Sequence, residues 1–160
     1  MRIAIGSDHN GYVLKEAVKA HLAELGHEVE DFGVANEEPV DYPDVAAAVA
    51  REVAAGKYPR AVLMCGTGIG MAITANKVPG VRAATVMDPY SAERAMKSNN
   101  AQVLCMGGRV ISPDVATLLV DHWLASEFAG GDSARKVAKI DDLDLGRVAA
   151  GHQSQRGQGR

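Results

Sequence analysis

The sequence predicts an α/β protein, in which a single doubly wound (Rossmann-like) sheet of five parallel strands carries helices on both faces. Short apolar runs alternate with longer amphipathic segments along the chain, and this alternation is typical of a parallel sheet covered by helices. Polar or glycine-rich turns follow several of the apolar runs. Because ligands of such sheets bind at the carboxyl ends of the strands, these turns are expected to carry the functional site.

The individual elements follow from apolar periodicity and from turn residues. The short apolar runs predict strands at residues 3–7, 28–32, 61–64, 83–87 and 103–106. The amphipathic segments predict helices at residues 12–25, 44–55, 71–77, 88–97, 112–125 and 133–143. Gly26 and Gly56 stand where the first two helices should end, while Asp44 and Ser112 stand where a helix should be capped.

The composition is that of a folded domain without an unusual charge. The chain has 160 residues, of which 47% are hydrophobic, and a formal net charge of −3. One domain is expected at residues 1–145, followed by a disordered tail at 146–160 that is rich in Gly, Gln, Ser and Arg. There is no basic stripe and no apolar run of membrane-spanning length, so neither nucleic acid nor a membrane is expected as a partner. The absence of a signal peptide, together with two cysteines that are expected to stay reduced, predicts a cytoplasmic protein.

The stretch from Cys65 to Gly70 is the strongest candidate for a functional site. A cysteine ends the third predicted strand, and three glycines follow it at every second position. Glycines allow a sharp turn and a close approach of the backbone to a ligand, and the free amides of the turn and of the next helix suit an anion. The same field favours a cysteine as its thiolate. A base beside an anion site suits proton abstraction next to a carbonyl group.

Two other interpretations of this stretch stay open. A glycine turn after a strand could be a dinucleotide-binding fingerprint, with Asp88 at the end of the next strand. However, the spacing is Gly-x-Gly-x-Gly, the turn does not follow the first strand, and Pro79-Gly80 shortens the helix behind it. Cys65 could also be a small buried hydrophobic residue, as free cysteines often are.

Further polar residues stand beyond the ends of other predicted strands. Asp8 and His9 follow the first strand, and Arg109 follows the fifth. Each also has an ordinary structural explanation, because Asp and Asn are common in turns and arginine is often exposed. Tyr42 could simply pack its ring, whereas the Thr67 hydroxyl stands where a substrate oxygen would lie.

Seven short motifs occur in order along the chain: Ser7-Asp8-His9-Asn10-Gly11, Asp41-Tyr42-Pro43, Cys65-Gly66-Thr67-Gly68-Ile69-Gly70, Ala75-Asn76-Lys77, Pro89-Tyr90-Ser91-Ala92, Asn99-Asn100 and Gly107-Gly108-Arg109. Together they resemble the ribose-5-phosphate isomerase B family, which also includes galactose-6-phosphate isomerase subunits. The resemblance covers about residues 1–140.

The resemblance implies an aldose–ketose isomerase of a small sugar phosphate that works without a metal or an organic cofactor. It also implies a homodimer, or a tetramer of two such dimers, with each active site built from two subunits. Cys65 would be the base that moves a proton between C1 and C2 through a cis-enediolate, with Asp8 and Thr67 binding sugar hydroxyls. The residues implied to contact the substrate or its phosphate are His9, Tyr42, Gly66, Gly68, Ile69, Gly70, Ser98, Asn99, Arg109, Arg135 and Lys136, of which Asn99 and Arg109 would come from the partner subunit.

Three positions depart from the usual pattern of the family. Ser98 stands where the family usually has a histidine that helps to open the sugar ring, and Asp132 and Lys136 stand where it usually has two arginines. The resemblance makes interconversion of ribose 5-phosphate and ribulose 5-phosphate the expected reaction, with Arg135 and Lys136 holding the phosphate. A tetrose 4-phosphate cannot form the five-membered ring and is shorter, so both departures also fit an alternative, interconversion of erythrulose 4-phosphate and erythrose 4-phosphate. A non-catalytic sugar-phosphate-binding subunit is the other alternative.

Overall fold

The computed structural model describes residues 1–147, and its elements follow the alternation that the sequence predicts. The strands are β1 (Arg2–Ser7), β2 (Glu28–Asp31), β3 (Arg60–Cys65), β4 (Ala83–Thr85) and β5 (Val103–Gly107). The helices are the short 3₁₀ helix η1 (His9–Gly11), α1 (Tyr12–Glu24), α2 (Tyr42–Ala54), α3 (Ile69–Ala75), α4 (Pro89–Lys97), α5 (Pro113–Leu124) and α6 (Asp132–Asp144). The expected tail at 146–160 lies outside the described residues from residue 148 onward, so the division at 145 stays a prediction.

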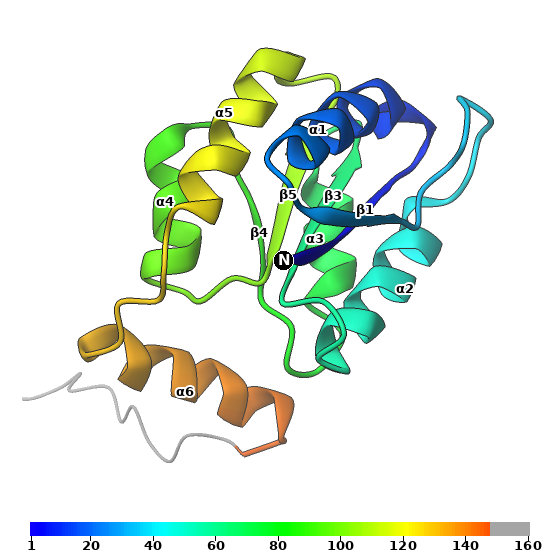
Figure 1. The fold of residues 1–160 in the computed structure, drawn as a ribbon. Helices are drawn as coiled ribbons and strands as arrows, with labels where there is room; N and C mark the ends of the chain where they lie inside the picture. Colours follow the sequence, from blue (N-terminus) through cyan, green and yellow to red (C-terminus); the bar gives the residue numbers. More distant parts are fainter. Residues whose placement is uncertain (148–160) are drawn as a thin grey trace, which may run out of the picture.

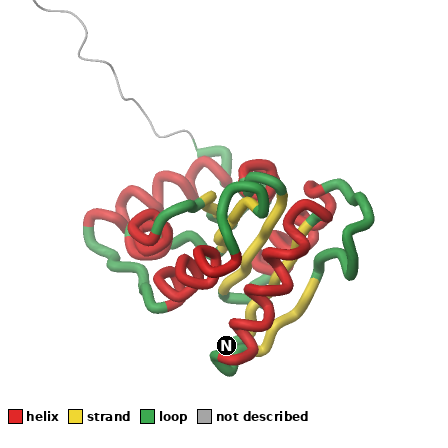
Figure 2. Tube along the Cα trace, turned by 90° about the horizontal axis from the view of Figure 1, so that it is seen from above, coloured by secondary structure: helices red, strands yellow, loops and turns green. Residues whose placement is uncertain are grey.

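The strands form one parallel sheet in the order β2-β1-β3-β5-β4. The chain moves outward from β1 to β2 and then crosses to β3 on the other side of β1, so its direction reverses between β1 and β3 (Figure 1). In open α/β sheets the crevice at such a reversal is where ligands bind. Figure 2 shows helices on both sides of the strands, which confirms the doubly wound fold.

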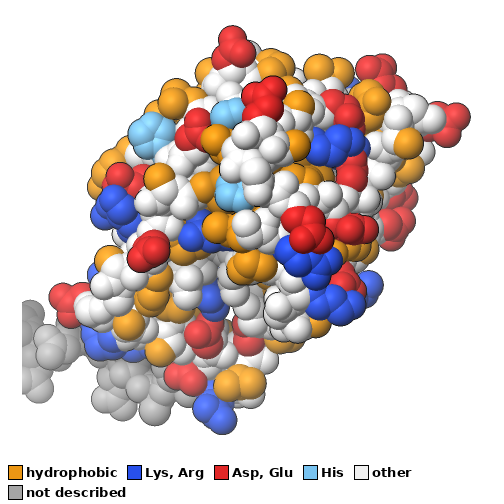
Figure 3. Space-filling view, in the orientation of Figure 1, with side chains coloured by type: hydrophobic (Ala, Val, Ile, Leu, Met, Phe, Trp, Pro, Cys, Tyr) orange, Lys and Arg blue, Asp and Glu red, His pale blue; other side chains and the backbone are white. Residues whose placement is uncertain are grey.

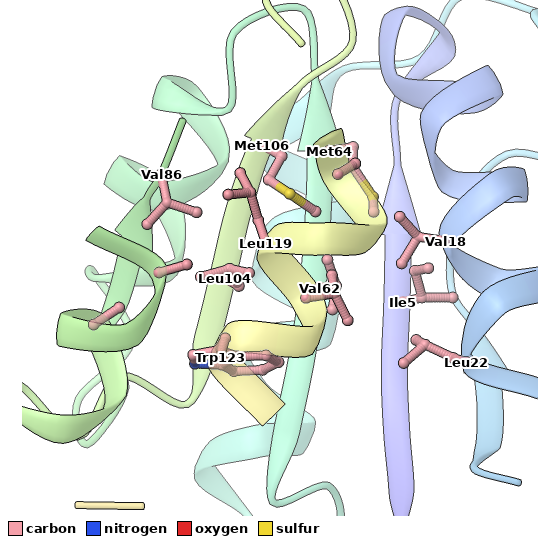
Figure 4. Close-up of a cluster of buried hydrophobic side chains, with 14 of the residues drawn as sticks. Ile5, Val18, Leu22, Val62, Met64, Val86, Leu104, Met106, Leu119 and Trp123 are labelled. Carbon is pink, nitrogen blue, oxygen red and sulfur yellow. The ribbon is translucent and has the colours of Figure 1, made fainter. Parts of the chain in front are cut away.

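Two apolar cores, one on each face of the sheet, hold the helices in place. Val62 and Leu104 face α1, α4 and α5, and Trp123 of α5 is fully buried on this side (Figure 4). Leu63 and Cys105, their neighbours along the strands, belong to a second cluster under α2 and α3. Successive residues of a strand point to opposite faces, so strands covered on both faces need the continuous apolar runs seen in the sequence. Full burial of one such leucine or valine contributes roughly 1.5–3 kcal/mol.

Most element boundaries lie close to where the sequence places them. Gly26 and Gly56, just after α1 and α2, both adopt positive φ. The start of α2 differs from the expectation: Asp41 is the residue before the helix and Pro43 lies in its first turn, so Asp44 is inside the helix rather than capping it. In addition, α3 begins two residues earlier and β4 ends two residues earlier than expected.

Helix α6 lies apart from the sheet, at the bottom of Figure 1. The guanidinium of Arg82 ties it to the rest of the chain through an ion pair with Asp141 at 2.7 Å. Val137 of α6 is buried, whereas Ile140 and Leu143 are 42% and 66% exposed. The helix therefore carries apolar side chains that residues 1–147 leave largely uncovered.

The surface carries charge of both signs, and Figure 3 shows acidic and basic side chains mixed over one face of the molecule. Some of these charges join elements: the His21 ring of α1 contacts the Asp121 carboxylate of α5 at 2.6 Å. Among residues 1–147, none of the helices has the length and apolar character needed to cross a membrane.

Candidate active site

The carboxyl ends of β1 and β3 meet where the chain reverses direction. Ser7 of β1 pairs with Met64 of β3, so the next residues along the two strands, Asp8 and Cys65, are neighbours. The Asp8 N–H donates to the Met64 carbonyl at 3.2 Å, and the Gly108 N–H donates to the Cys65 carbonyl at 2.8 Å. Main-chain hydrogen bonds thus join the turns that follow β1, β3 and β5.

Cys65 is the last residue of β3, and its side chain lies inside the glycine turn. The residue is 5% exposed, and its Sγ accepts a hydrogen bond from the Gly68 N–H at 3.1 Å. Gly68 has a φ of +78°, and a Cβ there would lie 2.8 Å from the carbonyl carbon of Met106, so the turn requires glycine. The Gly68 N–H therefore holds the sulfur in place inside the turn.

The N–H groups of the glycine turn divide into two sets. The Ile69 N–H donates to Thr67 Oγ1 at 3.3 Å, and the Gly68 N–H already donates to the thiol. Within residues 1–147, the N–H groups of Gly66, Thr67 and Gly70 have no acceptor. These three amides are therefore the donors that remain for an anionic oxygen. The expectation that all four of Gly66, Gly68, Ile69 and Gly70 bind the substrate stays a prediction.

Asp8 and Tyr42 both border the cavity that this turn lines. Asp8 is 4% exposed, and its Oδ1 accepts the N–H groups of Asn10 at 2.9 Å and Gly11 at 3.0 Å. The carboxylate therefore caps η1, as its turn chemistry predicts, and also borders the site. Tyr42 begins α2 and lies directly over Gly70, where an added Cβ would come within 2.5 Å of the tyrosine ring.

A cavity of about 400 Å³ lies between these groups. It is lined by Asp8, Asn10, Tyr42, Cys65, Gly66, Thr67, Ile69, Gly70 and Ile73. Sequence reasoning assigned a site role to all of these except Asn10 and Ile73. Ile73 follows Ile69 by one helical turn and so shares its face of α3. The predicted helix began at residue 71 and left Ile69 out, so this spacing was not recognised. A volume of this size suits a small metabolite.

Arg109 and His9 lie beside this cavity and are connected through Asn10. The Arg109 Nη2 donates to Asn10 Oδ1 at 2.6 Å, and Asn10 Nδ2 lies 3.0 Å from His9 Nε2. The backbone N–H of Arg109 also donates to the Gly66 carbonyl at 3.0 Å. The resemblance assigns Arg109 to the partner's site, but the structure places it beside the Cys65 turn of its own chain, because β5 is the neighbour of β3.

Four of the predicted site residues lie elsewhere in the chain. Ser98 and Asn99 follow α4, just before β5 begins, while Arg135 and Lys136 belong to α6. Because the strands are parallel, the start of β5 is at the opposite edge of the sheet from the end of β3. Asn99 lines a separate cavity of about 210 Å³ together with residues of β4 and α6. One chain alone therefore does not bring these four residues to Cys65.

The dinucleotide-binding interpretation fits the structure poorly. Asp88 caps α4, accepting the Ser91 N–H at 2.8 Å, and the helix behind the glycine turn has only seven residues. Cys105, the other free cysteine, is fully buried, and burial together with nearby Cys65 raises the pKa of its thiol far above the ordinary value. It is therefore unsuited to act as a base. In the part of the chain that the structure describes, no three His, Cys, Asp or Glu side chains are grouped to hold a metal ion.

Comparison with known proteins places the chain in a family. Residues 3–140 match the Ribose/Galactose Isomerase family. Ribose-5-P isomerase B of Listeria innocua is 51% identical over 144 residues, which cover 90% of this chain and 97% of that protein. D-erythrulose-4-phosphate isomerase of Pectobacterium atrosepticum is 49% identical, with 88% of this chain and 93% of that protein covered. The solved structure of Clostridium thermocellum ribose-5-phosphate isomerase B matches with a TM-score of 0.90 at 44% identity, covering 92% of this chain and 100% of that one. The chain therefore belongs to the ribose/galactose isomerase family.

Proposed function

We propose that this protein interconverts the aldose and ketose forms of a small sugar phosphate through a cis-enediolate, with Cys65 as the base. The observation that carries the proposal is the meeting of the Cys65 thiol, the Asp8 carboxylate and the Thr67 hydroxyl around one cavity. Membership of the family supports the reaction class, since the Listeria and Pectobacterium relatives are both named as sugar-phosphate isomerases.

The reaction requires a base that removes a proton next to a carbonyl group and returns it to the neighbouring carbon. The Cys65 thiolate takes the proton from C2 of the aldose, which leaves a neutral thiol and an enediolate with its charge on O1. A proton then passes from O2 to O1, and the thiol delivers its proton to C1, which gives the ketose and restores the thiolate. The Gly68 N–H, 3.1 Å from the sulfur, stabilises the thiolate before this transfer. The unpaired amides of Gly66, Thr67 and Gly70 stabilise the negative oxygen that develops on the enediolate.

The remaining groups orient the substrate. Two backbone amides occupy Oδ1 of Asp8, which leaves Oδ2 for a sugar hydroxyl, and the Thr67 hydroxyl binds a second one. The ring of Tyr42 covers one side of the sugar, and Arg109 and His9 supply the cation and the polar ring for the phosphate. No redox step or external cofactor is needed for this proton transfer.

The proposal includes a homodimer, or a tetramer of two dimers, in which a partner subunit completes each site. Ser98, Asn99 and the cations of α6 lie far from their own Cys65, so they can act only on another copy. The exposed Ile140 and Leu143 of α6 support such a contact, because uncovered apolar side chains favour association. The two unpaired cysteines support a location in the cytoplasm, where thiols stay reduced.

Two substrates are candidates, ribose 5-phosphate and a tetrose 4-phosphate. The relatives bear names for both, with comparable identity to this chain. Ser98 cannot supply the acid that opens a furanose, and Asp132 places a negative charge at the start of α6. Both features favour the shorter, open-chain tetrose, whereas Arg135 and Lys136 remain as cations for a pentose phosphate. A non-catalytic sugar-phosphate-binding subunit is the remaining alternative.

Exchange with solvent tests the function directly. The protein is incubated in deuterated water with ribose 5-phosphate and, separately, with erythrulose 4-phosphate. Deuterium at C2 of the aldose or C1 of the ketose is expected, and kcat/KM for the two pairs identifies the better substrate.

Cys65→Ala should lower kcat by about 10²–10⁴-fold, the usual contribution of a placed base. Cys105→Ala is the matched control and should keep its kcat. Normal turnover in Cys65→Ala would show that another group is the base.

A further inference from the structure

Asn10, which the sequence analysis names within a motif but gives no role, has both ends of its side chain engaged at the site. Its Oδ1 accepts from Arg109 Nη2 at 2.6 Å, and its Nδ2 lies 3.0 Å from His9 Nε2. A guanidinium can only donate hydrogen bonds, so the amide oxygen must face Arg109 and the amide nitrogen must face His9. The orientation of the Asn10 side chain is thereby fixed by chemistry as well as by distance.

Both ring nitrogens of His9 face a hydrogen-bond donor, and a neutral imidazole can accept only one hydrogen bond. Its Nε2 faces the Asn10 amide nitrogen, and its Nδ1 faces the Val40 N–H at 3.4 Å. A neutral imidazole has one acceptor nitrogen, and an imidazolium has none. The Asn10 contact is the shorter one, which favours Nε2 as the acceptor and a proton on Nδ1. With the proton on Nδ1, His9 cannot accept the Val40 N–H.

Val40 lies near the end of the loop at residues 33–41, which leads directly into Tyr42. The beginning of this loop is firmly held: Lys15 Nζ donates to the Val34 carbonyl at 2.8 Å, and Asp31 Oδ1 accepts the Gly33 N–H at 2.9 Å. The end of the loop is held by a side chain only if His9 Nδ1 accepts the Val40 N–H. The tautomer of His9 therefore decides whether the loop is attached at one end or at both.

We propose that Asn10 is a positioning residue that couples Arg109 to His9 and, through His9, to the loop at residues 33–41. The proposal rests on the proposed function, because the group that competes for Arg109 is the phosphate of the substrate. When a phosphate takes the guanidinium, the Asn10 amide loses its partner and is free to turn away from His9. His9 then carries its proton on Nε2, where it donates to the phosphate, and Nδ1 accepts the Val40 N–H.

Nitrogen NMR of the full-length protein labelled with ¹⁵N-histidine tests the coupling without any turnover. The His9 signal is assigned from its loss in His9→Gln. In the ligand-free protein, His9 should be the Nδ1–H tautomer, whereas in Asn10→Ala it should be the Nε2–H tautomer. Inorganic phosphate should convert the unsubstituted protein to the Nε2–H tautomer and leave Asn10→Ala unchanged. If His9 has the same tautomer in both ligand-free proteins, the proposal is wrong.

Kinetics supply a second readout that a purely structural role would not produce. Asn10→Asp places a carboxylate against Arg109, and this pair should raise KM for the sugar phosphate by about tenfold or more, the usual weight of a charge-assisted hydrogen bond. Asn10→Ala and Asn10→Ser free the guanidinium without adding a charge, so KM should rise less in these two variants than in Asn10→Asp. Equal KM in the aspartate and alanine variants would count against the coupling.

The matched control is Asn36→Ala, since Asn36 lies in the loop at residues 33–41 and its Oδ1 accepts the Glu38 N–H within that loop, at 2.9 Å. It should leave the His9 tautomer unchanged. The two readouts separate the proposals. A tautomer change in a protein without isomerase activity would support the coupling and refute the function. Isomerase activity with an unchanged His9 tautomer would support the function and refute the coupling.

Discussion

Replacement of Lys15 by methionine should destabilise the fold markedly, although lysine is usually a surface residue. The Lys15 side chain is 1% exposed, and its Nζ donates to Asp31 at 2.7 Å and to the Val34 carbonyl at 2.8 Å, with Glu16 at 2.9 Å. Methionine fills most of the same space but offers none of these donors. The Val34 carbonyl loses the Lys15 donor, whereas both carboxylates keep Lys19, at 2.7 Å from each.

The magnitude follows from these partners. Each hydrogen bond to a charged group is worth roughly 1.5–3 kcal/mol, but methionine also avoids the cost of burying an ammonium, which is several kcal/mol. The net loss for Lys15→Met is therefore about 2 kcal/mol, or roughly 4–8 °C in Tm for a chain of this size. Lys15→Ala also loses packing and should cost about 3–5 kcal/mol.

Thermal and urea unfolding at a fixed protein concentration measure these losses. The control is Lys57→Met, because Lys57 is 58% exposed and pairs with Glu52 at 2.7 Å on the surface. A pair of this kind contributes about 0–1 kcal/mol. If Lys15→Met melts at the same temperature as Lys57→Met, the buried contacts do not stabilise the fold and the reasoning is refuted.

The loss should also depend on pH in a defined direction. Burial tends to raise the pKa of Asp31, but hydrogen bonds from Lys15 and Lys19 outweigh it, so the pKa is lowered overall. A carboxyl whose pKa is lowered on folding stabilises the protein above its unfolded value of about 3.9 and loses this contribution as the pH falls through the folded value. The difference between Lys15→Met and the unsubstituted protein should therefore be full at pH 7 and shrink below about pH 4.

Three further predictions concern the site itself. Mixing inactive Cys65→Ala with inactive Asn99→Ala subunits should restore part of the activity, because one site of a mixed dimer is then intact; mixed dimers without activity would argue against a shared site. Gly70→Ala places a methyl group 2.5 Å from the Tyr42 ring, so the ring must move, and KM should rise while the fold, followed by circular dichroism, is kept. Ser98→His should raise kcat/KM for ribose 5-phosphate more than for a tetrose 4-phosphate, and an equal effect on both would contradict the ring-opening argument.

Much of the fold was predictable because its signals are local. The apolar run that ends at Cys65 marks β3, and the glycines behind it mark a turn with free amides, so the centre of the site followed from one short stretch. The order of the strands was not predictable in this way, because alternation of strands and helices is the same whichever neighbour each strand chooses. The reversal between β1 and β3, which brings Asp8 beside Cys65, appears only in the folded chain.

The residues that sequence reasoning missed or misplaced depend on contacts between distant parts of the chain. Asn10 and Arg109 are 99 residues apart, and no periodicity links them. Lys15 is buried together with the apolar residues of α1, and its Nζ contacts Asp31 and the Val34 carbonyl, which no sequence pattern links to it. Arg109 was assigned to a partner subunit by resemblance, whereas the pairing of β3 with β5 determines which site it borders.

The backbone hydrogen bonds between the turns have a consequence for how this site can change. The links from Asp8 to Met64, from Gly108 to Cys65 and from Arg109 to Gly66 all run between peptide groups, so they do not depend on which side chains the turns carry. Exchanging the side chains around the cavity should therefore alter the length and shape of the sugar that fits while the sulfur and the amides keep their mutual geometry. A scaffold of this kind can acquire a new substrate through replacement of a few side chains around the cavity, while the groups that transfer the proton stay in place.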